Sequence, residues 1–232
     1  KVRNKTLKGL LDNHVKNPAL QDALAGLWGY YGLPPSQLSA FYYAVATGEY
    51  LKNGSYYIKN RSQNLSNAIA DVIEKNGGKI LYGKEAVKIN VKNNTATSVV
   101  TSDGKTLPAR VVVSNANVPD TLFKMLPAGA LPDEYTGKIK GYKPSISAFT
   151  VWLGLNRELR GKIKTFNNHI ATSSNIDADY KSCMNGDVEK SSFSVCIFDN
   201  LFEGYSKPGL STVMILCLSG YEPWRRFEAD YK

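Results

Sequence analysis

The stretch of sequence that decides the fold runs from residue 53 to residue 126. It opens with NGSYYIKNRSQNLSNAIADVIEKNGGKI (residues 53–80) and closes with DGKTLPARVVVSNANVPDTLFKML (residues 103–126). Its clearest element is a helix, because apolar residues recur at the i, i+3, i+4, i+7 and i+8 positions of one face, namely Leu65, Ala68, Ile69, Val72 and Ile73. Gly77 follows where a helix needs a left-handed residue to end, a conformation that a residue without Cβ adopts at low cost.

Short strands and tight turns are predicted around this helix. Val87, Ile89 and Val91 alternate with polar residues, which is typical of a half-buried strand. Asp103-Gly104 indicates a hairpin, since such a turn needs positive φ. The uninterrupted apolar run at residues 111–113 is typical of a strand covered on both faces. The remaining predictions in this block are strands at residues 56–58, 80–82 and 98–100 and a turn at Asn93-Asn94.

The flanking sequence adds helices on one side and a sheet on the other. Residues 1–50 carry apolar residues at helical spacing and predict three helices, the second starting near Pro18, which suits a first helical turn. A further helix is expected after Val118. Residues 145–155, 193–199 and 211–219 predict longer strands of an antiparallel sheet. The fold class is therefore α+β: helices, a β-meander, and a mixed, largely antiparallel sheet.

Composition excludes several classes of protein. The chain has 232 residues, 43% of them hydrophobic, which is ample for a globular core. The net charge of +9 comes from scattered lysines and suits a solvated surface better than a nucleic-acid interface, so no nucleic-acid partner is expected. Three widely spaced cysteines and two distant histidines suggest neither a disulfide framework nor a metal site, and they fit a reducing, cytoplasmic compartment.

The motifs of most enzyme classes are absent from the sequence. There is no Gly-x-Gly, and hence no dinucleotide fingerprint, and no Walker loop, Gly-x-Ser-x-Gly elbow or His-Glu-x-x-His. No run of about 18 apolar residues predicts a transmembrane helix. No catalytic residue can therefore be named from a motif, and no metal ligand is predicted.

The order of elements in residues 53–126 resembles the phytoene desaturase, carotenoid isomerase and retinol saturase group of FAD-dependent oxidoreductases. That group shows an aromatic residue, a Leu/Ala helix, Gly-Gly, Val-x-x-Ile, Asp-Gly and an apolar strand ending in Ser-Asn-Ala. The counterparts here are Tyr56-Tyr57, Ser62-Gln63, Leu65 with Ala68, Gly77-Gly78, Val87 with Ile89, Asp103-Gly104, Ala109 and Ser114-Asn115-Ala116. Residues 208–224, PGLSTVMILCLSGYEPW, resemble the retinol saturase side of the group.

The resemblance implies a central fragment of a split FAD-dependent fold that lacks the N-terminal dinucleotide-binding motif. Residues 54–117 would be the middle segment of a discontinuous FAD-binding domain. Residues 1–53 would form the helical part, and residues 118–232 the sheet and helices, of a lobe that holds a lipophilic substrate. The implied cofactor is FAD in the full-length protein, with NAD(P) as a candidate electron partner, and desaturation, saturation or isomerisation proceeds through the flavin. The fragment alone is expected to be inactive and to bind FAD weakly, because the glycine loop that holds the pyrophosphate is missing.

The resemblance also nominates site residues. Val87 is a candidate for backbone contact with the adenine end of FAD, and Ser114, Asn115 and Ala116 would lie near the dinucleotide. Two of these residues also have a purely structural interpretation. Val87 could be a core residue of its strand, and Asn115 could cap the following helix. The substrate candidates are Phe41, Tyr56 and Tyr57, whose rings could instead pack in the core or against the sheet.

One departure from the family pattern stands immediately before the predicted helix. The family has Gly-Gly where the backbone passes close to the flavin, whereas this chain has Asn60-Arg61, followed by Ser62. The Arg61 charge opposes the helix dipole, at a cost of about 0.3–1 kcal/mol, or binds an anionic group of the cofactor or substrate. Arg61 and Ser62 are therefore included among the cofactor-binding candidates.

Two classes of function remain open from the sequence. The first is the flavoenzyme acting on a polyene, isoprenoid or other lipophilic small molecule. The second is a non-catalytic module that binds a lipid or a membrane surface through a basic, aromatic lobe. In either case peripheral association with a membrane surface is compatible with the basic charge.

Overall fold

The computed structural model describes residues 2–225 and residue 227. The chain forms two compact units. Ser66–Pro144 is the middle unit, and the described residues up to Leu65 and from Ser145 onwards form the main unit. The helices predicted in residues 1–53 and the sheet predicted in residues 118–232 therefore belong largely to the same unit. The assignment of an FAD role and a substrate role to separate segments stays a prediction.

The three helices predicted at the start of the chain are present and begin at side-chain caps. The Thr6 hydroxyl accepts a hydrogen bond from the Gly9 amide at 3.1 Å. Asn17 caps the second helix, whose first residue is Pro18 as predicted. Caps of this kind satisfy amides that have no partner within the helix. The elements are α1 (Leu7–His14), α2 (Pro18–Ala25), the 3₁₀ turn η1 (Trp28–Tyr30) and α3 (Ala40–Asn53).

These helices share a core with α7 (Ile176–Asn185) of the same unit. The Tyr43 side chain, on α3, is 5% exposed, and its hydroxyl donates to the Leu24 carbonyl at 2.7 Å. Trp28 meets Tyr180 of α7 edge to face. The buried members of this core come from helices and from the segment before α3: Leu7, Ala25, Trp28, Leu38, Tyr43 and Ile176.

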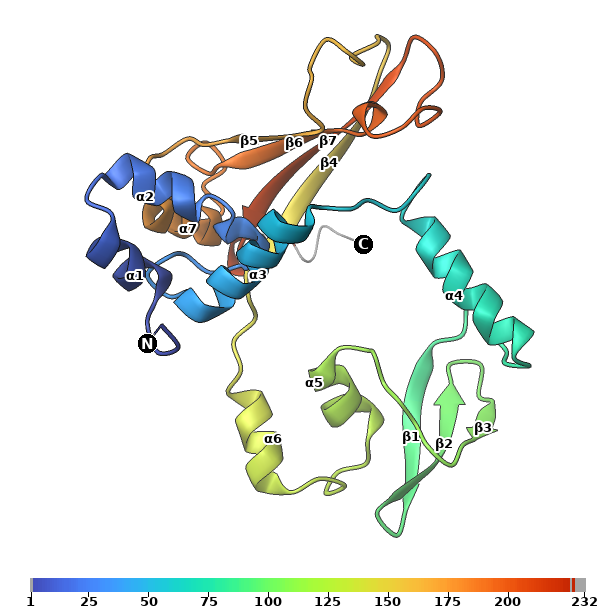
Figure 1. Ribbon diagram of the computed structural model, residues 1–232. Coiled ribbons are helices and arrows are strands. Elements are labelled where there is room, and N and C mark those ends of the chain that lie inside the picture. Colours follow the sequence, from blue (N-terminus) through green and yellow to red (C-terminus); the bar gives the residue numbers. More distant parts are fainter. Residues whose placement is uncertain (1, 226, 228–232) are drawn as a thin grey trace. The chain divides into compact units, whose positions relative to one another are not determined.

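A four-stranded sheet forms the rest of the main unit. Its strand order is β4-β7-β6-β5 and every neighbouring pair is antiparallel, which confirms the predicted sheet (Figure 1). The short edge strand β5 was not predicted. The elements are β4 (Ser147–Leu155), β5 (Asn167–Ile170), α7 (Ile176–Asn185), β6 (Phe193–Ile197), η3 (Phe198–Asn200), β7 (Ser211–Ser219) and α8 (Glu222–Arg225).

The middle unit contains the predicted long helix and meander. The two turns predicted from sequence take the expected conformations, with positive φ at Asn93, Asn94 and Gly104. Gly77 also has positive φ and follows the last turn of the helix. The elements are α4 (Gln63–Lys75), which starts in the main unit, β1 (Ala86–Lys92), β2 (Thr95–Thr101), β3 (Thr106–Pro108), α5 (Val118–Asp120), the π-helical turn η2 (Thr121–Met125) and α6 (Asp133–Lys140).

Three predicted strands are wrong. Residues 56–58, 80–82 and 111–113 are extended or irregular and pair with no strand among the described residues. The Val111 and Val113 side chains are 77% and 90% exposed, so the expected covering of both faces is absent. An apolar run becomes a strand only where a neighbouring strand accepts its backbone hydrogen bonds, and sequence pattern does not reveal whether that neighbour is present.

The predicted apolar face of α4 is formed but not covered. Leu65, Ile69 and Val72 lie on one helical face and are each more than half exposed. Within residues 2–225 and 227, no helix is long and apolar enough to cross a membrane. The apolar face is thus a surface feature of a short amphipathic helix.

Candidate functional site

The adenine-contact candidate Val87 lies at a β-bulge in β1. The antiparallel register passes from Ala86–Thr101 to Lys88–Val100 and skips Val87. A bulge re-aims the backbone and side chain of the extra residue away from the ladder. Val87 is 41% exposed, so the alternative interpretation as a core strand residue is wrong for this chain. Its place at a distorted, exposed position of the strand is compatible with backbone contact to a ligand.

Ser114, Asn115 and Ala116 form the turn that leads into α5. The Ser114 hydroxyl lies 2.8 Å from the hydroxyl of Thr121, and it accepts a hydrogen bond from the Ala116 amide at 3.3 Å. Thr121 belongs to η2, and η2 packs against β1, the strand that carries Val87. Residues 114–116 and Val87 therefore belong to neighbouring parts of the middle unit. The helix cap is Asn117, whose side chain accepts from the Asp120 amide, so the alternative interpretation of Asn115 as the cap is wrong.

The departure at Asn60-Arg61 has a structural explanation. Asn60 has φ +71°, the left-handed conformation that glycine adopts freely and that asparagine tolerates better than other residues. The Arg61 guanidinium lies 5.1 Å from the centre of the Tyr205 ring and donates to the Tyr205 carbonyl at 3.3 Å. Asn60 therefore keeps the backbone shape of a glycine position, and Arg61 directs its charge to the Tyr205 loop. The Ser62 carbonyl accepts from the Leu65 amide at the start of α4.

Tyr57 joins an aromatic cluster in the main unit. Phe198 lies at its centre, stacked on Trp152 at 5.1 Å and on Tyr205 at 5.0 Å between ring centroids. Tyr57 contacts three of the other rings at 5.9–6.5 Å, so it packs against the sheet lobe while keeping half of its surface exposed. The cluster comprises Tyr57, Trp152, Phe166, Phe198, Phe202 and Tyr205.

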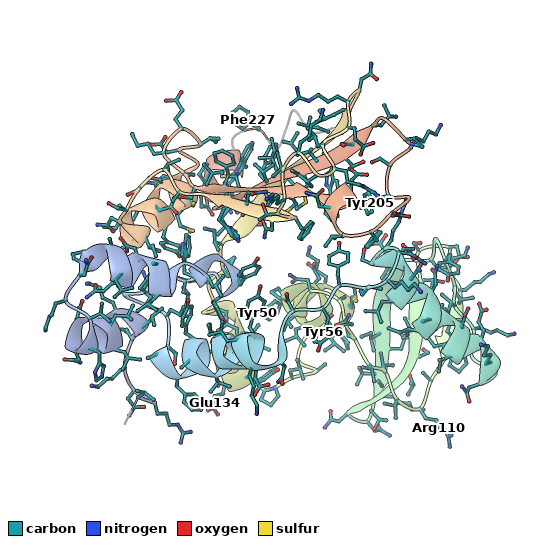
Figure 2. All side chains as sticks on the ribbon, turned by 45° about the horizontal axis from the view of Figure 1, so that its top comes forward. Tyr50, Tyr56, Arg110, Glu134, Tyr205 and Phe227 are labelled. Carbon is teal, nitrogen blue, oxygen red and sulfur yellow. The ribbon has the colours of Figure 1, made fainter. Side chains whose placement is uncertain are left out.

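The other two substrate candidates lie outside this cluster. Tyr56 is 90% exposed on the segment between α3 and α4, and Tyr205 lies on the loop after η3 (Figure 2). Phe41 is half exposed on α3, while its neighbour Tyr43 is buried in the helical core. The aromatic triplet of residues 41–43 thus divides between surface and core, as expected for consecutive residues of a helix.

Sequence reasoning missed a polar network on the sheet. Ser194 Oγ and His169 Nδ1 are 2.7 Å apart, and the Asn167 amide nitrogen lies 3.2 Å from the Tyr30 hydroxyl and 3.4 Å from His169 Nε2. Cys196 Sγ donates to Asn167 Oδ1 at 3.5 Å. The available signal was the run of polar residues at 167–169 and the Ser-Val-Cys alternation at 194–196. This pattern does not predict the network, because the pairing of β5 with β6 decides which of these side chains meet. We call this group the Tyr30–Ser194 network.

The three thiols are free; Cys183 and Cys196 are buried and Cys217 is partly buried. Burial raises the pKa of Cys196 and Cys217, and it raises the pKa of Cys183 to about 11. A buried thiol with a raised pKa is a poor nucleophile and a poor metal ligand. No cluster of histidine, cysteine and acidic side chains suited to a metal ion occurs in the part of the chain that the structure describes.

A hollow of about 320 Å³ lies beside the ends of β4 and β7. The Trp224 ring stacks on Phe149 at 5.1 Å, and its indole nitrogen donates to the Ser219 hydroxyl at 2.7 Å. No residue nominated from the sequence lines this hollow.

Comparison with known families decides what kind of protein carries these features. The family model described as flavin containing amine oxidoreductase matches residues 4–225. The chain belongs to this flavin-containing oxidoreductase family. The fold-class prediction agrees with the solved structure of an oxidoreductase from Methanosarcina mazei, which has a TM-score of 0.72 at 18% identity, covering 98% of this chain and 50% of that one.

The chain is also similar to a curated desaturase and a curated reductase. The chain is 27% identical over 128 residues to a 4,4'-diapophytoene desaturase of Methylomonas, which covers 55% of this chain and 25% of the relative. It is 23% identical over 242 residues to the all-trans-retinol 13,14-reductase of Danio rerio, which covers 98% of this chain and 39% of the relative. The chain therefore spans about a quarter to two fifths of the length of these curated relatives. The resemblance identified from sequence is confirmed.

Proposed function

We propose that the chain is the central portion of an FAD-dependent oxidoreductase that acts on a polyene, isoprenoid or similar lipophilic substrate. The observation that carries this proposal is the flavin oxidoreductase family match across residues 4–225. The relatives named above are a desaturase and a reductase whose names specify polyene compounds. The reaction class is hydride exchange with flavin, in the direction of desaturation, saturation or isomerisation.

Features of the middle unit support an FAD role for this part of the chain. The bulge leaves Val87 exposed on β1, and Ser114 is hydrogen-bonded to Thr121 of η2, which packs against β1. Val87, Ser114, Asn115 and Ala116 would contact the dinucleotide. Arg61 and Ser62, which belong to the main unit, stay cofactor-binding candidates from the sequence. FAD supplies the hydride chemistry when bound, while these residues would position it.

The aromatic cluster supports a lipophilic substrate. Stacked and edge-on rings provide a rigid apolar surface with little conformational entropy to lose on binding. Tyr57, half exposed at the rim of the cluster, is the substrate candidate that this surface favours most. Phe41 and Tyr56 stay candidates by their exposure alone. The described residues contain no feature that supports an NAD(P) partner, which therefore stays a prediction, as do cytoplasmic location and peripheral association with an anionic membrane.

The proposal is tested on the complete gene product that contains these residues. Purified with added FAD, it should be yellow, with flavin absorbance at about one cofactor per chain. When a conjugated polyene is added under anaerobic conditions, the flavin absorbance should decrease if the polyene reduces the flavin. It should increase if the polyene reoxidises a flavin that was reduced beforehand. A colourless protein that binds the polyene would contradict the enzyme assignment and favour the non-catalytic lipid-binding module. The 232-residue chain alone should retain little flavin, because the described part of the chain contains no glycine loop at a helix N-terminus.

A further inference from the structure

The pairing of the four strands places polar side chains next to apolar ones on one face of the sheet. His169 on β5 lies opposite Ser194 on β6, and Ser194 lies opposite Leu216 on β7. Because alternate residues of a strand share a face, the next row on the same face runs Asn167, Cys196, Met214 and Trp152. The face is therefore polar along β5 and β6, whereas β7 and β4 contribute the apolar side chains of Leu216, Met214 and Trp152 together with the hydroxyl of Thr150, which lies opposite Leu216.

The hydrogen bonds of the Tyr30–Ser194 network have one consistent direction. The Asn167 amide nitrogen only donates, so its contacts at 3.2 Å and 3.4 Å make Tyr30 Oη and His169 Nε2 acceptors. The neutral imidazole then carries its proton on Nδ1, which donates to Ser194 Oγ at 2.7 Å. The thiol of Cys196 donates to the Asn167 oxygen and fixes the orientation of the amide.

In this arrangement two hydroxyl groups have a proton that they do not donate within the network. Ser194 Oγ and Tyr30 Oη each accept a hydrogen bond within the network, and neither donates to another group among the described residues. Tyr30 is also held edge to face against the His169 ring, 6.0 Å between centroids. The network therefore presents hydroxyl donors, and no charged group, beside an apolar strip.

We propose that the Tyr30–Ser194 network binds the carbonyl oxygen of a conjugated, otherwise apolar ligand, with Ser194 as the principal donor and Tyr30 as the second. A neutral oxygen that only accepts hydrogen bonds matches two uncharged donors, whereas a carboxylate or phosphate would require a cation. The chain of such a ligand lies along Leu216, Met214 and Trp152. His169 and Asn167 act as positioning residues that orient the two donors. This inference rests on the proposed function and narrows its substrate class to polyenes that bear a carbonyl group.

The test compares two ligands on the complete, FAD-loaded gene product. One is a conjugated polyene methyl ketone, which forms imines with lysine far less readily than an aldehyde, and the other is the hydrocarbon in which C=CH₂ replaces C=O. Binding is followed by tryptophan fluorescence, and the carbonyl stretch is followed by infrared difference spectroscopy. The ketone should bind about tenfold more tightly than the hydrocarbon, which is the effect of about one net hydrogen bond. Its carbonyl stretch should move to lower frequency on binding.

Substitutions separate the donors from the scaffold. In Ser194→Ala the preference for the ketone should fall to about twofold or less and the frequency shift should shrink, while hydrocarbon affinity stays unchanged. Tyr30→Phe should give a smaller loss in the same direction. Ser174→Ala and Tyr142→Phe, at exposed positions elsewhere, are the matched controls and should behave as wild type.

The outcomes distinguish this inference from the proposed function. An unchanged ketone preference and carbonyl stretch in Ser194→Ala would overturn the inference and leave the flavoenzyme assignment intact. A protein without flavin that still prefers the ketone, and loses this preference in Ser194→Ala, would support the carbonyl site and overturn the flavoenzyme assignment.

Discussion

The guanidinium group of Arg61 lies over the ring of Tyr205, 5.1 Å from its centre, and donates to the Tyr205 carbonyl at 3.3 Å. The two residues are 144 positions apart in sequence. The contact fastens the segment before α4 to the loop after η3, within the main unit. Where the family pattern has Gly-Gly, this chain therefore has an arginine whose side chain contacts a distant loop. No local feature of the sequence predicts this contact.

The attachment should be measurable as a coupling energy. In a double-mutant cycle of Arg61→Met and Tyr205→Leu, the interaction energy should be about 0.5–1 kcal/mol, the range for an exposed cation–π pair. Urea unfolding followed by fluorescence provides the four stabilities. The control is Arg157→Met, at an exposed arginine that makes no hydrogen bond or cation–π contact with Tyr205 among the described residues; it should combine additively with Tyr205→Leu. A coupling no larger than that control would contradict the role given to Arg61.

The backbone at Asn60 gives a second prediction. Because Asn60 has φ +71°, Asn60→Ala should lower the free energy of unfolding by about 1 kcal/mol relative to Asn60→Gly. Asn60→Gly restores the family residue and needs no strained side chain. Asn156→Ala, at an exposed asparagine outside the left-handed region, should change stability by about 0.5 kcal/mol or less. Equal stabilities of the Ala and Gly variants would show that residue 60 is not left-handed in solution.

Asp103 in the β2–β3 hairpin should titrate well below an ordinary aspartate. Lys84 donates to its carboxylate at 2.6 Å and the Thr101 hydroxyl donates at 2.6 Å, and these bonds, the Lys84 bond foremost, lower the pKa of Asp103. A lowered folded-state pKa means that the carboxylate stabilises the folded state above the unfolded pKa of 3.8 and that this stabilisation is lost as the pH falls through the folded-state pKa. An NMR titration of the Asp103 carboxyl carbon checks the direction. Lys84→Met should move its midpoint upward, and an unmoved midpoint would exclude Lys84 as the main cause.

The neighbouring tyrosines of α3 provide a matched pair for the helical core. Tyr43→Phe removes a hydroxyl that donates to the Leu24 carbonyl at 2.7 Å from a side chain only 5% exposed. It should lower the free energy of unfolding by about 0.5–1.5 kcal/mol. Tyr42→Phe, at the exposed position beside it, should change stability by less than about 0.5 kcal/mol. Equal effects at the two positions would place residue 43 outside the core.

Interactions within a few residues were predictable from the sequence. The helix α4, the turns at Asn93-Asn94 and Asp103-Gly104 and the strands of the large sheet follow from periodicity and from residues that tolerate positive φ. The family was also recognisable, because the order of such local elements is preserved in the sequence. Of the candidate site, this level of reasoning located Val87 and the turn of residues 114–116, but not their bulge or their hydrogen bonds.

The tertiary structure decided whatever depends on a partner distant in sequence. The apolar run at residues 111–113 has strand composition, yet no neighbouring strand pairs with it among the described residues. Arg61 reaches Tyr205, and His169 meets Ser194, only because separate segments meet in one unit. Sequence determines the conformations that each segment prefers, since those depend on local sterics and periodicity. The register between strands and the packing between loops determine which side chains come together, and these depend on the free energy of the whole folded chain.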